Sequence, residues 1–189
     1  MANKHSTAPA ETKGFTIAEV LITIVIVGTL SAVALPNYFR QVQRSRQNEA
    51  AATLAQLLSI VAAYDDDYRS APSKWEDLSK ITAVMTDSGP ATAGTTAGNK
   101  PLTTAIILPG GNYQLEATAV DNPPDYYEFE ATPLPLPTPE EEASGDCNNC
   151  NYNVMACIYL KYGSSDVKIG TKDNQAEVVE DDLTCGQPE

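Results

Sequence analysis

The sequence has 189 residues and a formal net charge of −13 at pH 7. This length fits one domain with terminal extensions, because single domains usually have about 100–200 residues. Phosphate backbones repel a chain of this charge, so nucleic acid is not expected as its primary partner.

An apolar segment covers residues 15–35, FTIAEVLITIVIVGTLSAVAL. As an α-helix it would span about 30 Å, the thickness of the hydrocarbon core of a bilayer. A secretory signal peptide is the alternative, because Ala32 and Ala34 form an A-x-A-like cleavage site and two lysines precede the segment. Against it, the segment exceeds the roughly 7–15 residues of a signal core and contains an acidic residue.

That acidic residue is Glu19, five residues into the segment. A carboxylate inside an apolar span costs about 3 kcal/mol, so it is usually paired or reaches water. Glu19 could extend to the membrane surface, or it could await a cation on another molecule. A newly formed amino terminus would be such a cation.

Residues 13–20, KGFTIAEV, resemble the processing site of type IV prepilins. The resemblance implies that a membrane peptidase and methyltransferase cuts after Gly14 and methylates the new amino terminus at Phe15. It also implies an assembly role for Glu19, which would pair with the Phe15 ammonium of a neighbouring subunit. A mismatched stagger would then leave a buried charge unpaired.

Two further positions match the family, Gly28 and Pro36, where pilin helices can lose regularity or bend. The resemblance is strong over residues 15–46 and only architectural beyond them. It implies a leader at residues 1–14, a transmembrane or filament-core helix at 15–35, an amphipathic half at 36–66 and a globular head at 67–189.

One charge pattern disagrees with export of the C-terminal part. Lys4 and Lys13 precede the apolar segment, whereas Arg40, Arg44 and Arg46 follow it. The positive-inside rule therefore mildly favours a cytoplasmic C-terminal part, although large domains often translocate regardless of charge. The processing motif and the cysteines favour export. The three arginines are otherwise expected on a solvated helix face or at a membrane surface.

After Pro36, apolar residues recur at helical spacing and predict one buried face. They are Ala50, Leu54, Leu57, Leu58, Val61 and Tyr64. The helix should end near Asp65, Asp66 and Asp67, because three acids oppose the dipole at a helix C-terminus. A calcium site is the alternative interpretation of these acids, but the alternating pattern of a calcium loop is absent.

The head should continue with a short helix over residues 73–85, capped by Ser73 with Glu76, and with Trp75, Leu78 and Ile81 or Val84 packed inward. A surface loop is expected at 87–99. Strands are expected at 102–108, 113–120, 126–131 and 151–162, with a weaker one at 167–170. A proline-rich acidic loop is expected at 132–144.

The four cysteines are Cys147, Cys150, Cys157 and Cys185. Beside an export-like N-terminus they predict disulfides, and three pairings are possible. We favour Cys147 with Cys150 and Cys157 with Cys185. Half a metal site or a redox pair is the alternative, but no second C-x-x-C follows.

These patterns predict an α+β protein with a long N-terminal helix on an antiparallel sheet of about four strands and a disulfide-bound C-terminal region. Catalytic signatures, metal motifs and cofactor motifs are not found, so no enzyme is expected. The resemblance implies identical or related pilin subunits, prepilin peptidase, an inner-membrane assembly platform and the lipid bilayer as partners. A type II secretion pseudopilin, a minor tip pilin and an exported binding domain that does not polymerise remain alternatives.

Overall fold

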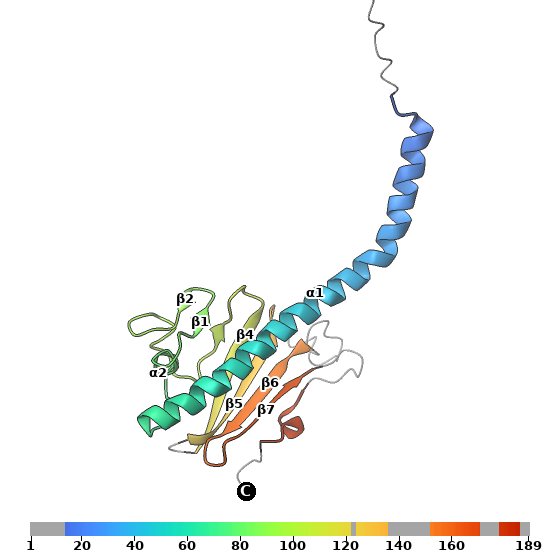
Figure 1. Ribbon diagram of the computed structural model, residues 1–189. Helices are drawn as coiled ribbons and strands as arrows, with labels where there is room; N and C mark the ends of the chain where they lie inside the picture. Colours follow the sequence, from blue (N-terminus) through green and yellow to red (C-terminus); the bar gives the residue numbers. More distant parts are fainter. Residues whose placement is uncertain (1–13, 122–123, 136–151, 171–177, 186–189) are drawn as a thin grey trace, which may run out of the picture. The chain divides into compact units, whose positions relative to one another are not determined.

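The computed structural model describes residues 14–121, 124–135, 152–170 and 178–185 (Figure 1). The chain divides into two compact units, residues 1–41 and 42–189. Helix α1 (Ile17–Tyr68) has 52 residues, and the boundary between the units falls within it. The long N-terminal helix predicted from the sequence is therefore confirmed.

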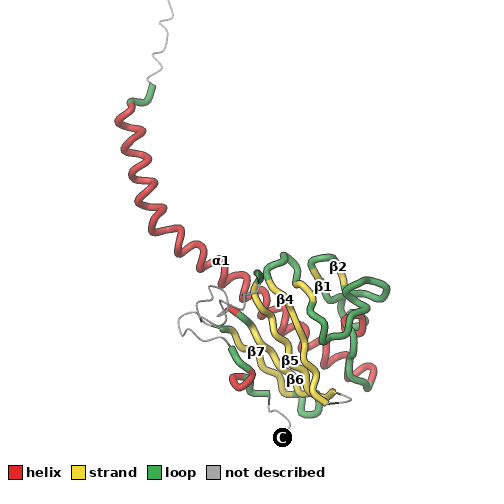
Figure 2. Tube along the Cα trace, turned by 180° about the vertical axis from the view of Figure 1, so that it is seen from behind, coloured by secondary structure: helices red, strands yellow, loops and turns green. Residues whose placement is uncertain are grey.

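The second unit contains a five-stranded antiparallel sheet in which the strand order follows the sequence, β3-β4-β5-β6-β7. Its strands are β3 (Ile106–Ile107), β4 (Tyr113–Asp121), β5 (Pro124–Pro133), β6 (Val154–Tyr159) and β7 (Ser164–Ile169). Figures 1 and 2, seen from opposite sides, show the C-terminal part of α1 lying across one face of this sheet. The meander predicted from the sequence is confirmed, with five strands in place of about four.

The core lies between α1 and the sheet, and the predicted helical face is buried. Leu54 and Val61 are fully buried, and the other four residues of that face are at most 6% exposed. On β4, Leu115 and Ala117 are buried against the helix while Glu116 points to solvent. Burial of this apolar surface is the main force that holds the helix on the sheet.

Side-chain hydrogen bonds to distant backbone groups join the helix to the sheet and the sheet to the C-terminal segment. The amide of Gln47 on α1 donates to the carbonyl oxygens of Gly170 at 2.7 Å and Asn153 at 3.3 Å. Asn153 is fully buried; its side chain donates to the Val178 carbonyl and accepts from the Val178 amide. Each buried polar group thereby finds a partner.

Strand β3 is shorter than the strand predicted at residues 102–108. Before it, the amide of Leu102 donates to the Ser73 carbonyl, and the amide of Thr104 donates to the Pro101 carbonyl. The chain thus turns at 101–104, so only Ile106 and Ile107 pair with β4. Strand β6 is likewise shorter than the predicted 151–162, whereas β4, β5 and β7 are longer than predicted.

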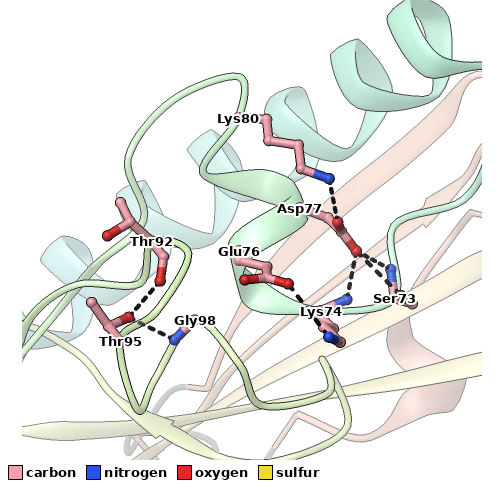
Figure 3. A network of polar contacts seen from close by, with 8 residues as sticks. All are labelled: Ser73, Lys74, Glu76, Asp77, Lys80, Thr92, Thr95 and Gly98. Atoms are coloured by element: carbon pink, nitrogen blue, oxygen red, sulfur yellow. Dashed lines mark hydrogen bonds and ion pairs between the residues drawn. The ribbon is translucent and has the colours of Figure 1, made fainter.

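The predicted helix at 73–85 is also short, because α2 covers only Trp75–Leu78. Its cap is shifted by one residue from the predicted Ser73 and Glu76 pair. Asp77 performs the capping: its carboxylate accepts hydrogen bonds from the amides of Ser73 and Lys74 (Figure 3). After α2, the Val84 amide donates to the Ser79 hydroxyl and closes a loop instead of another helical turn. Trp75, Leu78 and Val84 are buried, as predicted.

The region predicted as a surface loop at 87–99 has structure of its own. A small hairpin joins β1 (Met85–Thr86) to β2 (Gly89–Pro90), and the Thr86 hydroxyl donates to the Gly89 carbonyl at 2.7 Å. Ala91, directly after the hairpin, is fully buried in the core. The chain then folds back on itself, where the Thr95 hydroxyl donates to the Thr92 carbonyl and accepts from the Gly98 amide (Figure 3).

The C-terminal segment packs on the sheet face opposite α1. A disulfide joins Cys157 on β6 to Cys185, with the two Cα atoms 6.0 Å apart. Cys157, Cys185, Tyr126 and Tyr159 form a second buried cluster, with Leu183 packed against it. This pairing agrees with the favoured prediction; Cys147 and Cys150 lie outside the described residues, as does most of the predicted proline-rich loop at 132–144.

Candidate assembly site on the N-terminal helix

The described part of the first unit is an apolar helix whose side chains are unburied. Phe15 is 89% exposed, Ile17 82% and Val33 70%. The same holds for the other large apolar residues of the segment, namely Val20, Leu21, Ile22, Ile24, Val25, Ile26, Val27, Leu30 and Leu35. An apolar surface of this extent marks a site of contact with lipid or with other protein. By length and composition α1 could cross a membrane, a test that signal sequences near an N-terminus also pass.

The hydroxyl groups within the apolar helix bond to its own backbone. Thr23 donates to the carbonyl of Val20, Thr29 to that of Ile26, and Ser31 to that of Val27, over 2.7–2.9 Å. These bonds suit a helix in lipid or in a helix bundle, because no water is needed to complete them. The carboxylate of Glu19 differs, since it carries a charge.

Glu19 caps the start of α1 together with Thr16. The Thr16 amide and hydroxyl donate to Oε2 of Glu19 at 2.8 and 2.7 Å, and the Glu19 amide donates to the Thr16 hydroxyl at 3.3 Å. With Thr16 just before the first helical residue and Glu19 at its third position, this is a capping box. The signal was available in the sequence as T-x-x-E, but the prediction assigned these residues only to processing and assembly.

Capping satisfies hydrogen bonds of the Glu19 carboxylate but does not neutralise its charge. No ion pair of Glu19 is found within the described part of the chain. Favourable burial of the carboxylate therefore calls for a cation that the described residues do not place beside it.

Gly14 and Phe15 lie in exposed, non-helical chain directly before α1. A side chain at Gly14 would meet no atom within 4 Å, and the same is true of Gly28 inside α1. Contacts among the described residues therefore do not explain either glycine. The helix is continuous through Gly28 and Pro36, and the predicted loss of regularity at these positions stays a prediction for the assembled state.

In the head, the described residues contain no group of three or more His, Cys, Asp or Glu side chains that could hold a metal ion. The calcium interpretation of Asp65 to Asp67 thus gains no support from the structure. The helix ends at Tyr68, where Arg69 takes a left-handed conformation with φ of 51° and its amide donates to the Asp65 carbonyl.

The head and the helix together define an α+β protein that carries an unburied apolar N-terminal helix with one acid near its start. Two curated proteins are similar to the chain. It is 24% identical over 109 residues to the type IV major fimbrial protein FimA of Dichelobacter nodosus, a match that covers 58% of this chain and 66% of FimA. It is 36% identical over 52 residues to the type IV major pilin protein PilA of Myxococcus xanthus (strain DK1622), which covers 28% of this chain and 24% of PilA.

The chain therefore spans slightly less than two thirds of FimA and about a quarter of PilA. No family model and no solved structure matches it. The similarities agree with the long helix, the antiparallel sheet and the C-terminal disulfide. The protein is type IV pilin-like.

Proposed function

We propose that this chain is the precursor of a structural subunit of a type IV pilus. A prepilin peptidase cuts it after Gly14 and methylates the amino group of Phe15, while the apolar helix holds the precursor in the inner membrane. An assembly platform in that membrane then transfers the subunit into an extracellular filament, with residues 15–35 in the filament core. The filament serves adhesion, motility or DNA uptake.

The observation that supports this proposal best is the charge of Glu19 on a helix whose apolar surface is unburied. Cutting after Gly14 creates an ammonium group at Phe15. In a staggered bundle, the carboxylate of one subunit pairs with the ammonium of the next, and each charge is then compensated in an apolar core. Breaking such a buried pair costs about 3–5 kcal/mol, which fixes the stagger.

The test is mass spectrometry of the mature N-terminus and electron microscopy of material sheared from cells. We expect a methylated Phe15 as the first residue, and filaments that contain this chain. In a Glu19→Ala variant, cleavage after Gly14 should persist while filament yield falls sharply. A Val20→Ala variant is the matched control for the loss of side-chain volume at the neighbouring position.

The other candidate functions give different results. A mature protein that begins at Leu35 would indicate ordinary secretion and a binding domain that does not polymerise. Short periplasmic filaments would indicate a type II secretion pseudopilin, and label confined to filament tips would indicate a minor pilin. Normal filaments from Glu19→Ala would refute the charge-pairing role.

A further inference from the structure

Two groups of charges are left unexplained by the assembly site. Asp65, Asp66 and Asp67 lie in the last two turns of α1, which has no basic residue in its last turn, so they oppose the helix dipole. Arg46 follows the apolar segment, on the side where the positive-inside rule disfavours it if the head is exported. Both groups would be stabilised if they met each other in different copies of the chain.

The acidic group borders a groove beside the edge strand β7. The groove has a volume of about 520 Å³ and lies between α1 and the ends of β6 and β7. Leu58 and Ala62 of α1 and Leu160 after β6 supply apolar walls, while Asp65 and Asp66 of α1 supply acidic residues. None of the described residues that line it is basic. A groove with apolar walls and acidic residues at its border fits a partner that offers a cation.

Not all carboxylates of the groove are equally available. Asp166 of β7 also borders the groove, but its carboxylate lies on the sheet face opposite α1, where it accepts hydrogen bonds from the amide and hydroxyl of Thr184 and pairs with Lys168 at 3.4 Å. Asp66, in contrast, is exposed on α1, and the structure records no hydrogen bond or ion pair of its side chain among the described residues. Asp66 is thus the group on which a partner cation would have the largest effect.

Arg46 occupies the diagonally opposite corner of the head. It is exposed and borders a shallow hollow formed with Leu108 and Pro109 of the β3–β4 turn and with Tyr113 at the start of β4. One acid, Glu49, borders the same hollow. The groove lies at the β7 edge and the far end of α1, whereas Arg46 lies toward the β3 edge and twenty residues earlier.

We propose that these two corners meet in the filament: Arg46 of one copy enters the groove of a second copy and pairs with its Asp66. This contact rests on the proposed function, because it joins subunits in one polymer. The twenty residues between Arg46 and Asp66 set an axial offset of about 30 Å between the two copies. Two different surface regions are joined, so the interface is heterologous and generates an open helical assembly, not a closed dimer.

Charge reversal tests the contact in the full chain expressed in its native host. Asp66→Lys and Arg46→Glu should each reduce the yield of sheared filaments at least about tenfold, because like charges then face each other at every interface. The double variant, R46E with D66K, restores opposite charges and should return the yield to near that of the unmodified chain. Asp67→Lys is the matched control, since Asp67 does not line the groove.

The stability of the subunit separates a contact defect from a folding defect. A lysine at position 66 or 67 favours the helix dipole, so the thermal midpoint of the detergent-solubilised subunit should stay equal or rise in both variants. We therefore expect D66K to be a stable subunit that assembles poorly and D67K to be a stable subunit that assembles well. A fall in the midpoint of D66K together with its filament yield, with no rescue by R46E, would overturn the contact.

A photoreactive residue at position 66 identifies the occupant of the groove directly. We expect cross-links in sheared filaments to map to the surroundings of Arg46 in another copy. Filaments that form normally but cross-link elsewhere, or to a different protein, overturn this contact and leave the proposed function standing. Absence of filaments from the unmodified chain overturns the proposed function and the contact together.

Discussion

Asp166 on β7 holds Thr184 of the C-terminal segment through two hydrogen bonds, 2.6 Å from the Thr184 hydroxyl and 3.0 Å from its amide. Asp166 is the cross-strand partner of Cys157, and Thr184 precedes Cys185. The polar link and the disulfide therefore lie side by side at the same register of the sheet. The C-terminal segment is fixed there both covalently and by a carboxylate.

The polar link predicts a dependence of stability on pH. The hydrogen bond from the Thr184 hydroxyl, aided by the Thr184 and Val167 amides and Lys168, lowers the pKa of Asp166 despite some desolvation. A pKa that is lower in the folded than in the unfolded state contributes stability above the unfolded value, near 4, which is lost as pH falls through the folded value. Asp166→Asn should thus lower the free energy of unfolding at pH 7.

Denaturant titrations of both proteins between pH 2 and 7 are the measurement. The difference between unmodified protein and Asp166→Asn should narrow as the pH falls, because both side chains are then uncharged. Lys168→Ala serves as the control for the ion pair, whose two partners are partly exposed, and should have a smaller effect. A difference that stays constant over this pH range would contradict the assignment to Asp166.

The disulfide predicts a larger effect on global stability. It closes a loop between residues 28 apart in sequence, for which loop entropy gives about 3–4 kcal/mol of stabilisation. Replacing Cys157 and Cys185 by serine should lower the free energy of unfolding by about that amount, as measured by chemical denaturation. A disulfide between Cys147 and Cys150, the other predicted pair, would close a much shorter loop. Replacing these two cysteines by serine should therefore lower the free energy of unfolding by less. Equal losses in the two variants would be evidence against this account.

Asp77 stabilises the segment that connects α1 to the sheet by accepting several hydrogen bonds. Its carboxylate accepts from the Ser73 and Lys74 amides, from the Ser73 hydroxyl and from Nζ of Lys80 at 2.7 Å (Figure 3). Partial burial raises the pKa of Asp77, but the hydrogen bond from Lys80 and the backbone bonds outweigh it and lower the pKa overall. Asp77→Asn should destabilise the head by about 1–2 kcal/mol at pH 7.

The stabilisation by Asp77 is present above the unfolded pKa, near 4, and is lost as pH falls through the folded pKa. Glu76→Gln is the control: among the described residues the Glu76 carboxylate pairs with the exposed Lys74 at 3.4 Å, so its loss should change stability little. Thermal unfolding of the three proteins at pH 7 and at pH 3 compares them. Should Glu76→Gln prove as destabilising as Asp77→Asn, the capping role of Asp77 would be wrong.

Gly98 marks the place where the segment after β2 folds back most tightly. A Cβ atom there would overlap the carbonyl oxygen of Thr92 and crowd the Thr95 hydroxyl. Gly98→Ala should therefore force a backbone shift and destabilise the head by about 1–3 kcal/mol, the usual effect of overpacking. Thr96→Ala, in the same segment but exposed, is the control. Equal thermal midpoints for the two variants would show that the turn tolerates the shift.

The sequence predicts those parts of the fold whose neighbours are close in sequence or follow a simple period. The buried face from Ala50 to Tyr64 follows from helical spacing, and the alternation on β4 follows from strand spacing. Gln47 and Asn153 could not be predicted as buried, because Gln47 bonds to carbonyl groups 106 and 123 residues away. The short β3 was missed for the same reason, since the Leu102 bond to Ser73 decides where the strand can begin. The cap of α2 was misplaced by one residue for a local reason, because Asp77 and not Glu76 accepts from the amides of Ser73 and Lys74.

The capping of α1 was missed for a different reason. Glu19 fits two patterns at once, the processing motif and the T-x-x-E box, and only the first was used. Thr16 was therefore predicted only as part of the processing motif, although its hydroxyl contacts Glu19, the charged residue of the apolar segment 15–35. This contact leads to a prediction for the isolated subunit.

Thr16→Val should loosen the first turn of α1. The substitution keeps the shape of the side chain and the Thr16 amide bond to Glu19, but it removes the hydroxyl that serves as donor and acceptor in the box. Loss of a threonine cap costs about 1 kcal/mol, so the amides of the first turn should exchange with solvent about fivefold faster. Hydrogen exchange of the subunit in detergent micelles measures this effect.

Thr23→Val is the control, because its hydroxyl bonds only to a helix carbonyl, at Val20. If first-turn exchange changed equally in both variants, Thr16 would have no special role in capping, and the Glu19 carboxylate would be positioned by the rest of the helix alone.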